Sequence, residues 1–290
     1  MRSFPRCFLD FVASFLGLAA LLLAAGCGSS QQGQSGASQP PADRAETVIF
    51  DIDAGRAVDP RMANPYLPST QRDKGLHQCM IEPLFMLNYE TGKIEPWLGV
   101  SMTPNERFDV WTLVLRNGIK WSDGEKFDAD DVVFTINMLI SNAPFLLSSA
   151  QLAQWVARAE KTDSLTVKFT LKKPDARFQL DFFSVKIWSS IAIVPRHIWK
   201  DVNPQTFSNN YDPEKGWPVF TGPYRCTGVG ETEFTYTRDD NWWGAKSGWK
   251  PLPKPRILKW AWYGPSSTVT CQDLTILSRF GHFFDWKVKM

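Results

Sequence analysis

The chain has 290 residues, of which 43% are hydrophobic and 13% aromatic, so it is long enough to bury a large apolar core. Its 32 Lys and Arg residues nearly balance its 30 Asp and Glu residues, and a formal net charge of +2 gives no electrostatic basis for binding nucleic acid. The sequence contains no G-x-S-x-G, no H-E-x-x-H and no Gly-rich phosphate loop with lysine, so the common hydrolase, metalloprotease and nucleotide-binding classes find no support. We expect no cofactor and no metal site.

Residues 1–26 have the organisation of an export signal. Arg2 and Arg6 form a basic start, and residues 11–25 are apolar apart from Ser14, which is long enough for a signal core and too short to span a bilayer. The segment ends in "LLLAAGCGSS" and resembles a bacterial lipoprotein signal, in which Cys27 would be lipidated and become the first mature residue. An ordinary cleaved signal with an incidental cysteine is the alternative.

Residues 27–46 are predicted to be a flexible tether. The stretch "GSSQQGQSGASQPPADRAE" holds almost no apolar side chains, so it cannot bury enough surface to offset the entropy of ordering the chain. Behind a lipid anchor, such a tether would hold a folded body away from a membrane surface.

From residue 47 onward, strand and helix patterns are interspersed, which indicates an α/β or α+β fold. Alternation of apolar and polar residues predicts strands at 46–53, 110–118, 165–171, 232–244 and 256–264, and an apolar run predicts a buried strand at 187–195. We expect helical structure from residue 76 to Pro83, across 175–185 and from Pro195 onward, with a turn at 219–224.

Five carboxylates cluster in "WSDGEKFDADD", and the sequence poses the question of whether they form a site. They are Asp123, Glu125, Asp128, Asp130 and Asp131. With Asp128 as the N-cap, the last two acids fall in the first turn of a helix, where the helix dipole favours negative charge. Apolar residues then recur at helical spacing from Val132 to Ile140. We therefore predict that the acids begin a helix and do not form a catalytic or metal site.

The cysteines allow at most one disulfide in the exported chain. Cys7 lies in the signal and Cys27 is the predicted lipid site, which leaves Cys79, Cys226 and Cys271. Their spacing suits no zinc site.

Four segments carry a resemblance to a known family. "LRNGIKWSDGEKFDADDVVFTI", "IVPRHIW", "FTGPY" and "RDDNWWG" occur in the order and approximate spacing of the extracytoplasmic solute-binding proteins of peptide and nickel ABC importers, family 5. The resemblance covers about residues 47–270. The first segment is long and specific, and the other three are informative mainly through their order.

The resemblance implies an α/β fold, a periplasmic-binding-protein-like (type II) lobe with an inserted α+β subdomain. The lobe core would comprise 47–95 and 195–264, and the insert 96–194. Relatives run to about twice this length, so the second lobe is expected to be missing and residues 265–290 to be either its start or an aberrant tail. A frameshift or a truncated gene model is the preferred explanation, and a natural one-lobe variant is the alternative.

The resemblance also implies a ligand cleft between two lobes. Five residues are expected to line this half of it: Asn64, Tyr66, Trp188, Gly222 and Tyr224. We expect Trp242 and Trp243 to pack in the structure rather than to form a platform for a sugar, because neighbours at a strand end point to opposite faces. His197 is expected to be a helix-terminal or core residue rather than a metal ligand.

We predict a monomeric, non-enzymatic substrate-binding lipoprotein that delivers a peptide or similar solute to ABC permease subunits outside the cytoplasmic membrane. Two alternatives remain from the residues alone: a secreted glycan-acting hydrolase, whose two carboxylates could meet across a cleft, and a structural lipoprotein without a ligand.

Overall fold

The computed structural model describes residues 46–52, 55–68, 72–184, 190–262 and 264. Cys27, Trp188, Cys271 and the whole of 265–290 lie outside the described residues, as do the predicted signal and nearly all of the predicted tether. Within the described part, no helix is both long enough and apolar enough to cross a bilayer.

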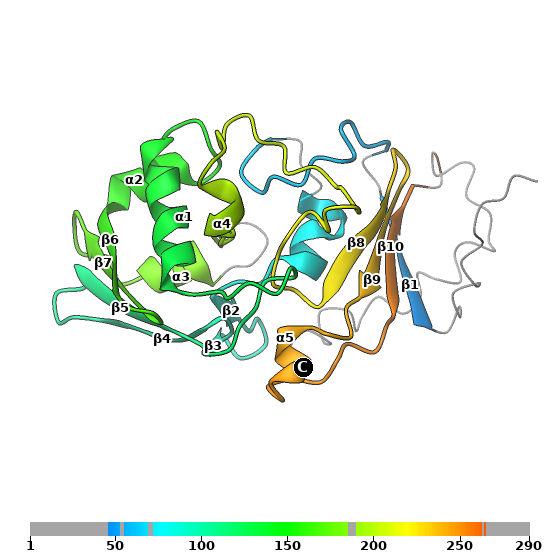
Figure 1. The fold of residues 1–290 in the computed structure, drawn as a ribbon. Helices are drawn as coiled ribbons and strands as arrows, with labels where there is room; N and C mark the ends of the chain where they lie inside the picture. Colours follow the sequence, from blue (N-terminus) through cyan, green and yellow to red (C-terminus); the bar gives the residue numbers. More distant parts are fainter. Residues whose placement is uncertain (1–45, 53–54, 69–71, 185–189, 263, 265–290) are drawn as a thin grey trace, which may run out of the picture. The chain divides into compact units, whose positions relative to one another are not determined.

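One four-stranded sheet joins the beginning of the described chain to its end (Figure 1). Its strands, in spatial order, are β1 (Thr47–Asp51), β10 (Ile257–Ala261), β9 (Glu233–Arg238) and β8 (Tyr224–Val229). β1 runs parallel to β10, whereas β9 is antiparallel to both of its neighbours. Alternation places Phe234 and Tyr236 of β9 in the core, fully buried.

A second four-stranded sheet is built from contiguous sequence. Its order is β4 (Gly99–Pro104), β5 (Val110–Leu115), β7 (Thr166–Leu171) and β6 (Val156–Asp163), all antiparallel. On β5, Trp111, Leu113 and Leu115 are buried while the alternate residues are half-buried, which is the pattern expected for a sheet covered on one face. A short hairpin of β2 (Phe85–Leu87) and β3 (Ile94–Pro96) precedes it.

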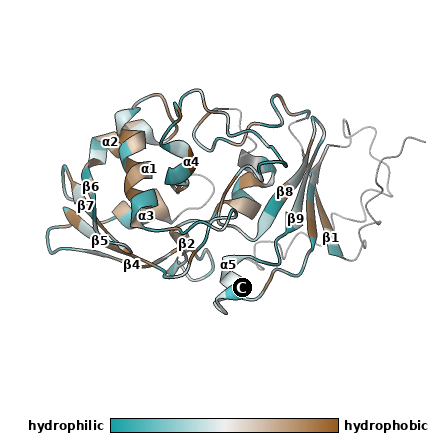
Figure 2. Cartoon of the chain, in the orientation of Figure 1, coloured by the Kyte–Doolittle hydropathy of each residue, from teal (hydrophilic) through white to brown (hydrophobic). Residues whose placement is uncertain are grey.

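The helices are short apart from one. They are η2 (Arg72–Met80), α1 (Ala129–Ser141), α2 (Ser149–Trp155), α3 (Phe178–Phe183), α4 (Arg196–Trp199) and α5 (Trp243–Lys246). α1 packs on β6 and β7, and brown and teal segments alternate along it in Figure 2, as an amphipathic helix requires. η2 is a π-helix with a kink at Gly75, whose φ of 101° is open to glycine at little cost.

The acidic cluster begins α1, as predicted. Asp128 is the N-cap, and its side chain accepts a hydrogen bond from the backbone N–H of Asp130 at 2.8 Å. Asp131 accepts one from the N–H of Asp128 at 3.1 Å, which completes a capping box. Asp130 also pairs with Lys161 at 2.6 Å on the surface.

Replacing Asp128 with alanine is expected to lower the free energy of unfolding by about 1 kcal/mol, because the cap hydrogen bond is lost while the helix itself remains. Urea denaturation followed by circular dichroism measures the change. Asp128→Asn keeps an accepting oxygen and should stay close to the parent chain. A loss of ligand or metal binding without any loss of stability would show that the cap assignment is wrong.

The prediction of a strand at 187–195 is wrong for its described part. Residues 190–195 are not in a strand, although 190–194 are buried. The N–H of Ile191 donates to the carbonyl of Phe182 in α3 at 2.9 Å, and that of Val194 donates to the hydroxyl of Thr135 in α1 at 3.1 Å. These two backbone N–H groups are bound by residues of helices and not by a neighbouring strand. The apolar run therefore indicates burial here and not strand pairing.

Candidate functional site

Asn64, a predicted ligand residue, joins two loops to each other. Its side chain is fully buried, and its Nδ2 donates to the carbonyls of Pro204 at 3.1 Å and Phe207 at 2.6 Å. Its Oδ1 accepts from the N–H of Tyr66 at 2.8 Å. The amide therefore fastens the loop after β1 to the 203–211 loop.

Tyr66 also faces the interior. It is 3% exposed, its hydroxyl donates to the carbonyl of Ala192, and its ring meets Trp199 edge-on with centroids 6.3 Å apart. The structure thus joins Asn64 and Tyr66 by a hydrogen bond. Both side chains are buried, and their polar groups are hydrogen-bonded to the protein.

Gly222 and Tyr224 lie on either side of Pro223, where the chain enters β8. The N–H of Gly222 donates to the carbonyl of Met80 at 2.7 Å, at the end of η2. The buried Tyr224 hydroxyl donates to the carbonyl of Pro255 at 2.8 Å, and burial raises the pKa of this phenol far above its ordinary value.

All four described members of the predicted ligand set are buried. The fifth, Trp188, lies outside the described residues. Their role toward a ligand is not tested by these contacts and stays a prediction; what the contacts establish is that each of the four also has a packing task.

Asp131 of the acidic cluster is bound by groups of the protein, and the described acids are not grouped as metal ligands. Asp131 is buried and accepts from the indole N–H of Trp121 at 3.1 Å and from the N–H of Arg196 at 2.8 Å. Desolvation raises the pKa of Asp131, and the hydrogen bonds from Arg196, Asp128 and Trp121 oppose that rise. Among the described residues, no three His, Cys, Asp or Glu side chains are grouped as ligands of an ion.

His197 is paired with one of the acids at the surface. Its Nε2 lies 2.7 Å from Oδ2 of Asp123, with both side chains about one-third exposed. The pair links the start of α4 to the turn before α1, which agrees with the prediction of a helix-terminal histidine.

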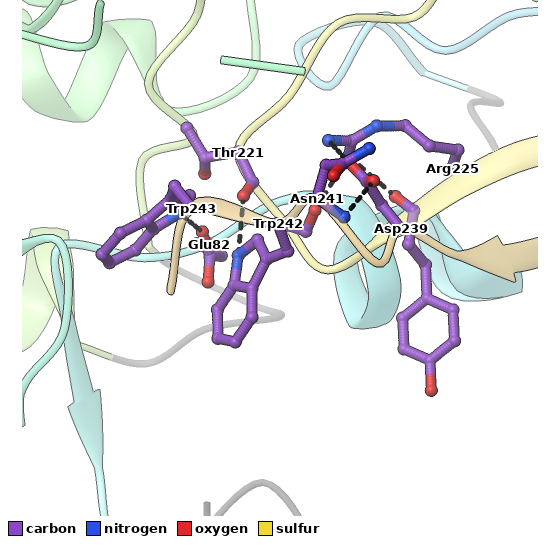
Figure 3. A network of polar contacts seen from close by, with 9 residues as sticks. Glu82, Thr221, Arg225, Asp239, Asn241, Trp242 and Trp243 are labelled. Carbon is purple, nitrogen blue, oxygen red and sulfur yellow. Dashed lines mark hydrogen bonds and ion pairs between the residues drawn. The ribbon is translucent and has the colours of Figure 1, made fainter. Parts of the chain in front are cut away.

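A cavity of about 440 Å³ lies beside β8, and the sequence assigned no ligand role to the residues that line it. Its walls include Ser122, Tyr211, Trp217, Arg225 and Asp239. Arg225 and Asp239 form an ion pair with Nη2 and Oδ2 2.5 Å apart, drawn in Figure 3. Burial lowers the pKa of the Arg225 guanidinium, and the adjacent carboxylate of Asp239 opposes this shift.

The cavity wall also carries a thiol. Cys226 is a free cysteine, so it does not pair with Cys79, and burial raises the pKa of its thiol to about 12. The thiol is therefore neutral at physiological pH and adds no negative charge to the cavity.

A second polar network surrounds a buried glutamate. Glu82 is 4% exposed, and its carboxylate accepts from the indole N–H groups of Trp97 at 3.0 Å and Trp243 at 2.9 Å. Trp242 donates in the same way to the carbonyl of Thr221 at 3.1 Å (Figure 3). The expectation that Trp242 and Trp243 pack in the structure is confirmed, although Trp243 begins α5 and does not end a strand.

Two residues of the cavity wall stand in or next to segments that the sequence analysis noted, but the sequence did not indicate what these residues do. Arg225 directly follows "TGPY", and Asp239 belongs to "RDDNWWG", so both lie in segments already noted for their order along the chain. What the sequence lacked was the pairing of strand ends in β8 and β9, which puts Arg225 and Asp239 together.

These features define an α/β lobe in which the acids that begin α1 serve helix capping, ion pairing and packing. The chain belongs to the bacterial extracellular solute-binding proteins, family 5, whose middle-region sequence model matches residues 93–259. The matched range contains all four segments noted in the sequence.

Individual relatives point the same way. The chain is 27% identical over 223 residues to the glutathione-binding protein GsiB of Salmonella paratyphi A, which is 76% of this chain and 39% of that protein. It is similar to the mannohexaose-bound periplasmic oligopeptide-binding protein of Thermotoga maritima, with 26% identity, a TM-score of 0.60, and coverage of 76% of this chain and 38% of the other.

A nickel-binding relative shares the fold. NikZ of Campylobacter jejuni, solved in complex with Ni(L-His), is 23% identical with a TM-score of 0.59, covering 75% of this chain and 39% of that one. The chain therefore spans about two-fifths of the length of each of these relatives.

Proposed function

We propose that this chain is the solute-binding component of an ABC importer, or the N-terminal part of one. It would be exported, anchored through a lipid on Cys27, and would deliver a peptide or similar solute to permease subunits without altering it. The observation that carries the proposal is the family match across 93–259, which covers more than half of the chain.

The geometry of the acids supports binding without chemistry. Glycoside hydrolysis needs two carboxylates facing a shared space at a fixed separation. In the part of the chain that the structure describes, Asp128 and Asp131 cap α1, while Asp130 pairs with Lys161 and Asp123 pairs with His197. The carboxylate of Glu82 is bound by two tryptophans. These roles leave them engaged with the protein itself.

Relatives more than twice as long suggest how the solute would be held. We propose that the described residues form one side of a cleft, that a second lobe forms the other, and that solute shifts an open–closed equilibrium which the permease reads. Asn64, Tyr66, Trp188, Gly222 and Tyr224 remain the proposed contacts on this side, and the working unit is proposed to be a monomer.

Solute uptake by cells tests the proposal. Deleting the gene should abolish saturable uptake of at least one labelled probe among short peptides, glutathione and a manno-oligosaccharide, and restoring the gene should return it. Labelled palmitate should be incorporated into the parent chain and not into Cys27→Ser. Hydrolysis of any probe by the purified chain, lost on replacing an acid, would instead show an enzyme, and unchanged uptake across the set would contradict transport.

A further inference from the structure

The cavity beside β8 is built by segments far apart in the sequence. The end of η2 contributes Met80, the turn before α1 contributes Ser122, and the 211–218 segment contributes Trp217. Arg225 of β8 and Asp239 after β9 complete the polar wall. Its volume of about 440 Å³ lies within the range of about 300–1,000 Å³ typical of sites for small molecules.

One polar atom in the wall has no partner in the described chain. Ser122 Oγ is shielded from solvent and makes no hydrogen bond, while the backbone N–H of the same residue is bound to the carbonyl of Phe220 at 3.0 Å. Leaving a buried hydroxyl unbonded costs about 1–3 kcal/mol. Ser122 lines the cavity, so rotation about χ1 to another staggered position would turn this sealed oxygen toward a partner there.

Arg225 also retains hydrogen-bonding capacity. Its Nη1 donates to the carbonyls of Gly222 at 2.8 Å and Tyr224 at 3.2 Å, and its Nη2 donates to Asp239. A guanidinium has five N–H donors, so the Nε–H and one Nη2–H remain unused in the described chain. These contacts hold the guanidinium plane in place, and the remaining donors are preorganised for an acceptor.

The charges around the cavity select a ligand that carries both signs. A simple anion would meet the carboxylate of Asp239, and a simple cation would meet Arg225. A molecule with a carboxylate and an ammonium on one carbon atom can satisfy both ends of the ion pair at once. The apolar parts of the wall, Met80, Trp217 and Pro218, then suit a nonpolar side chain.

We propose that this cavity binds an apolar α-amino acid in its zwitterionic form. The carboxylate accepts from Arg225 and from the Ser122 hydroxyl, and the ammonium donates to Asp239. Every residue that lines the cavity belongs to the described part of the chain, so binding here needs no second lobe and does not rest on the proposed function.

Calorimetry on the purified 290-residue chain in mild detergent tests the site with three matched probes. L-leucine should bind, whereas L-leucinamide, which lacks the carboxylate, and 4-methylpentanoate, which lacks the ammonium, should each bind at least about tenfold more weakly. Equal binding of all three, or no binding of L-leucine, L-methionine and L-phenylalanine, would overturn the proposal.

Two serine variants separate ligand contact from folding. Ser122→Ala removes a hydroxyl that makes no hydrogen bond within the described chain, so stability should hold while L-leucine affinity falls about tenfold. Ser190 offers a matched control, since its hydroxyl is also buried with no hydrogen-bond partner among the described residues and does not line the cavity. Ser190→Ala should leave affinity unchanged, and equal effects of the two variants would overturn the proposal.

Discussion

Replacing Glu82 with leucine is expected to lower the free energy of unfolding by about 3–5 kcal/mol. The carboxylate is buried and holds the indole N–H groups of Trp97 and Trp243 in charge-assisted hydrogen bonds at 3.0 and 2.9 Å. Leucine fits the space approximately but leaves both donors unpaired away from water.

The surroundings of Glu82 increase the cost. Trp249 stacks on Trp243 with centroids 4.9 Å apart, Arg116 lies 4.3 Å from the centre of the Trp249 ring, and Lys250 lies 4.6 Å from that of Trp97. Burial lowers the pKa of Arg116 and of Lys250, and the negative charge of Glu82 opposes that lowering in both cations. Without Glu82, Arg116 and Lys250 each lose a nearby negative charge in a largely apolar cluster, although Lys250 keeps that of Glu95.

Equilibrium urea unfolding, followed by near-ultraviolet circular dichroism of the tryptophan cluster, measures the change. Glu82→Gln should cost less, about 1–3 kcal/mol, because the amide oxygen can still accept from one indole while its NH₂ group faces the other donor. The exposed Glu90 provides the control, and Glu90→Leu should stay within about 0.5 kcal/mol of the parent. If Glu82→Leu matches Glu90→Leu, the network does not hold the cluster together.

Local patterns predicted the elements whose hydrogen bonds are local. The cap at Asp128 follows from side-chain reach over three residues, and the alternation on β5 and β7 follows from the two-residue period of a strand. The segment at 187–195 shows the limit, because an apolar run reports burial and cannot say which backbone groups will be its partners.

The hydrogen-bond partners of Glu82, Asn64 and Tyr66 could not be predicted from the sequence for a different reason, which is their distance along the chain. Glu82 and Trp243 are 161 residues apart, and the hydrogen bond between them forms only when η2, α5 and the sheet have packed together. Asn64 and Tyr66 were noticed because polar residues in a loop suggest a ligand, yet their partners at Phe207 and Ala192 are more than 120 residues away. A loop residue can serve packing and recognition alike, and its type alone does not separate the two.

Replacing Gly222 with alanine is expected to destabilise the chain by about 3 kcal/mol, and this experiment bears directly on that distinction. A Cβ at this position would lie 2.4 Å from the carbonyl oxygen of Cys79 and 2.5 Å from that of Met80, both of them backbone atoms at the end of η2. Real Cβ atoms essentially never approach other atoms so closely, and backbone cannot rotate away as a side chain can.

Three hydrogen bonds prevent the segment from moving aside to make room for that methyl group. The N–H of Gly222 is bound to Met80 at 2.7 Å, its carbonyl accepts from Arg225 at 2.8 Å, and the neighbouring carbonyl of Phe220 accepts from Ser122 at 3.0 Å. Thermal and urea unfolding measure the loss, and Gly230→Ala is the control because its added Cβ would meet only the carbonyl of Glu233, at 3.7 Å. A stable Gly222→Ala chain would show that the close approach to η2 can relax, and the glycine would then be better explained by a bound solute than by packing.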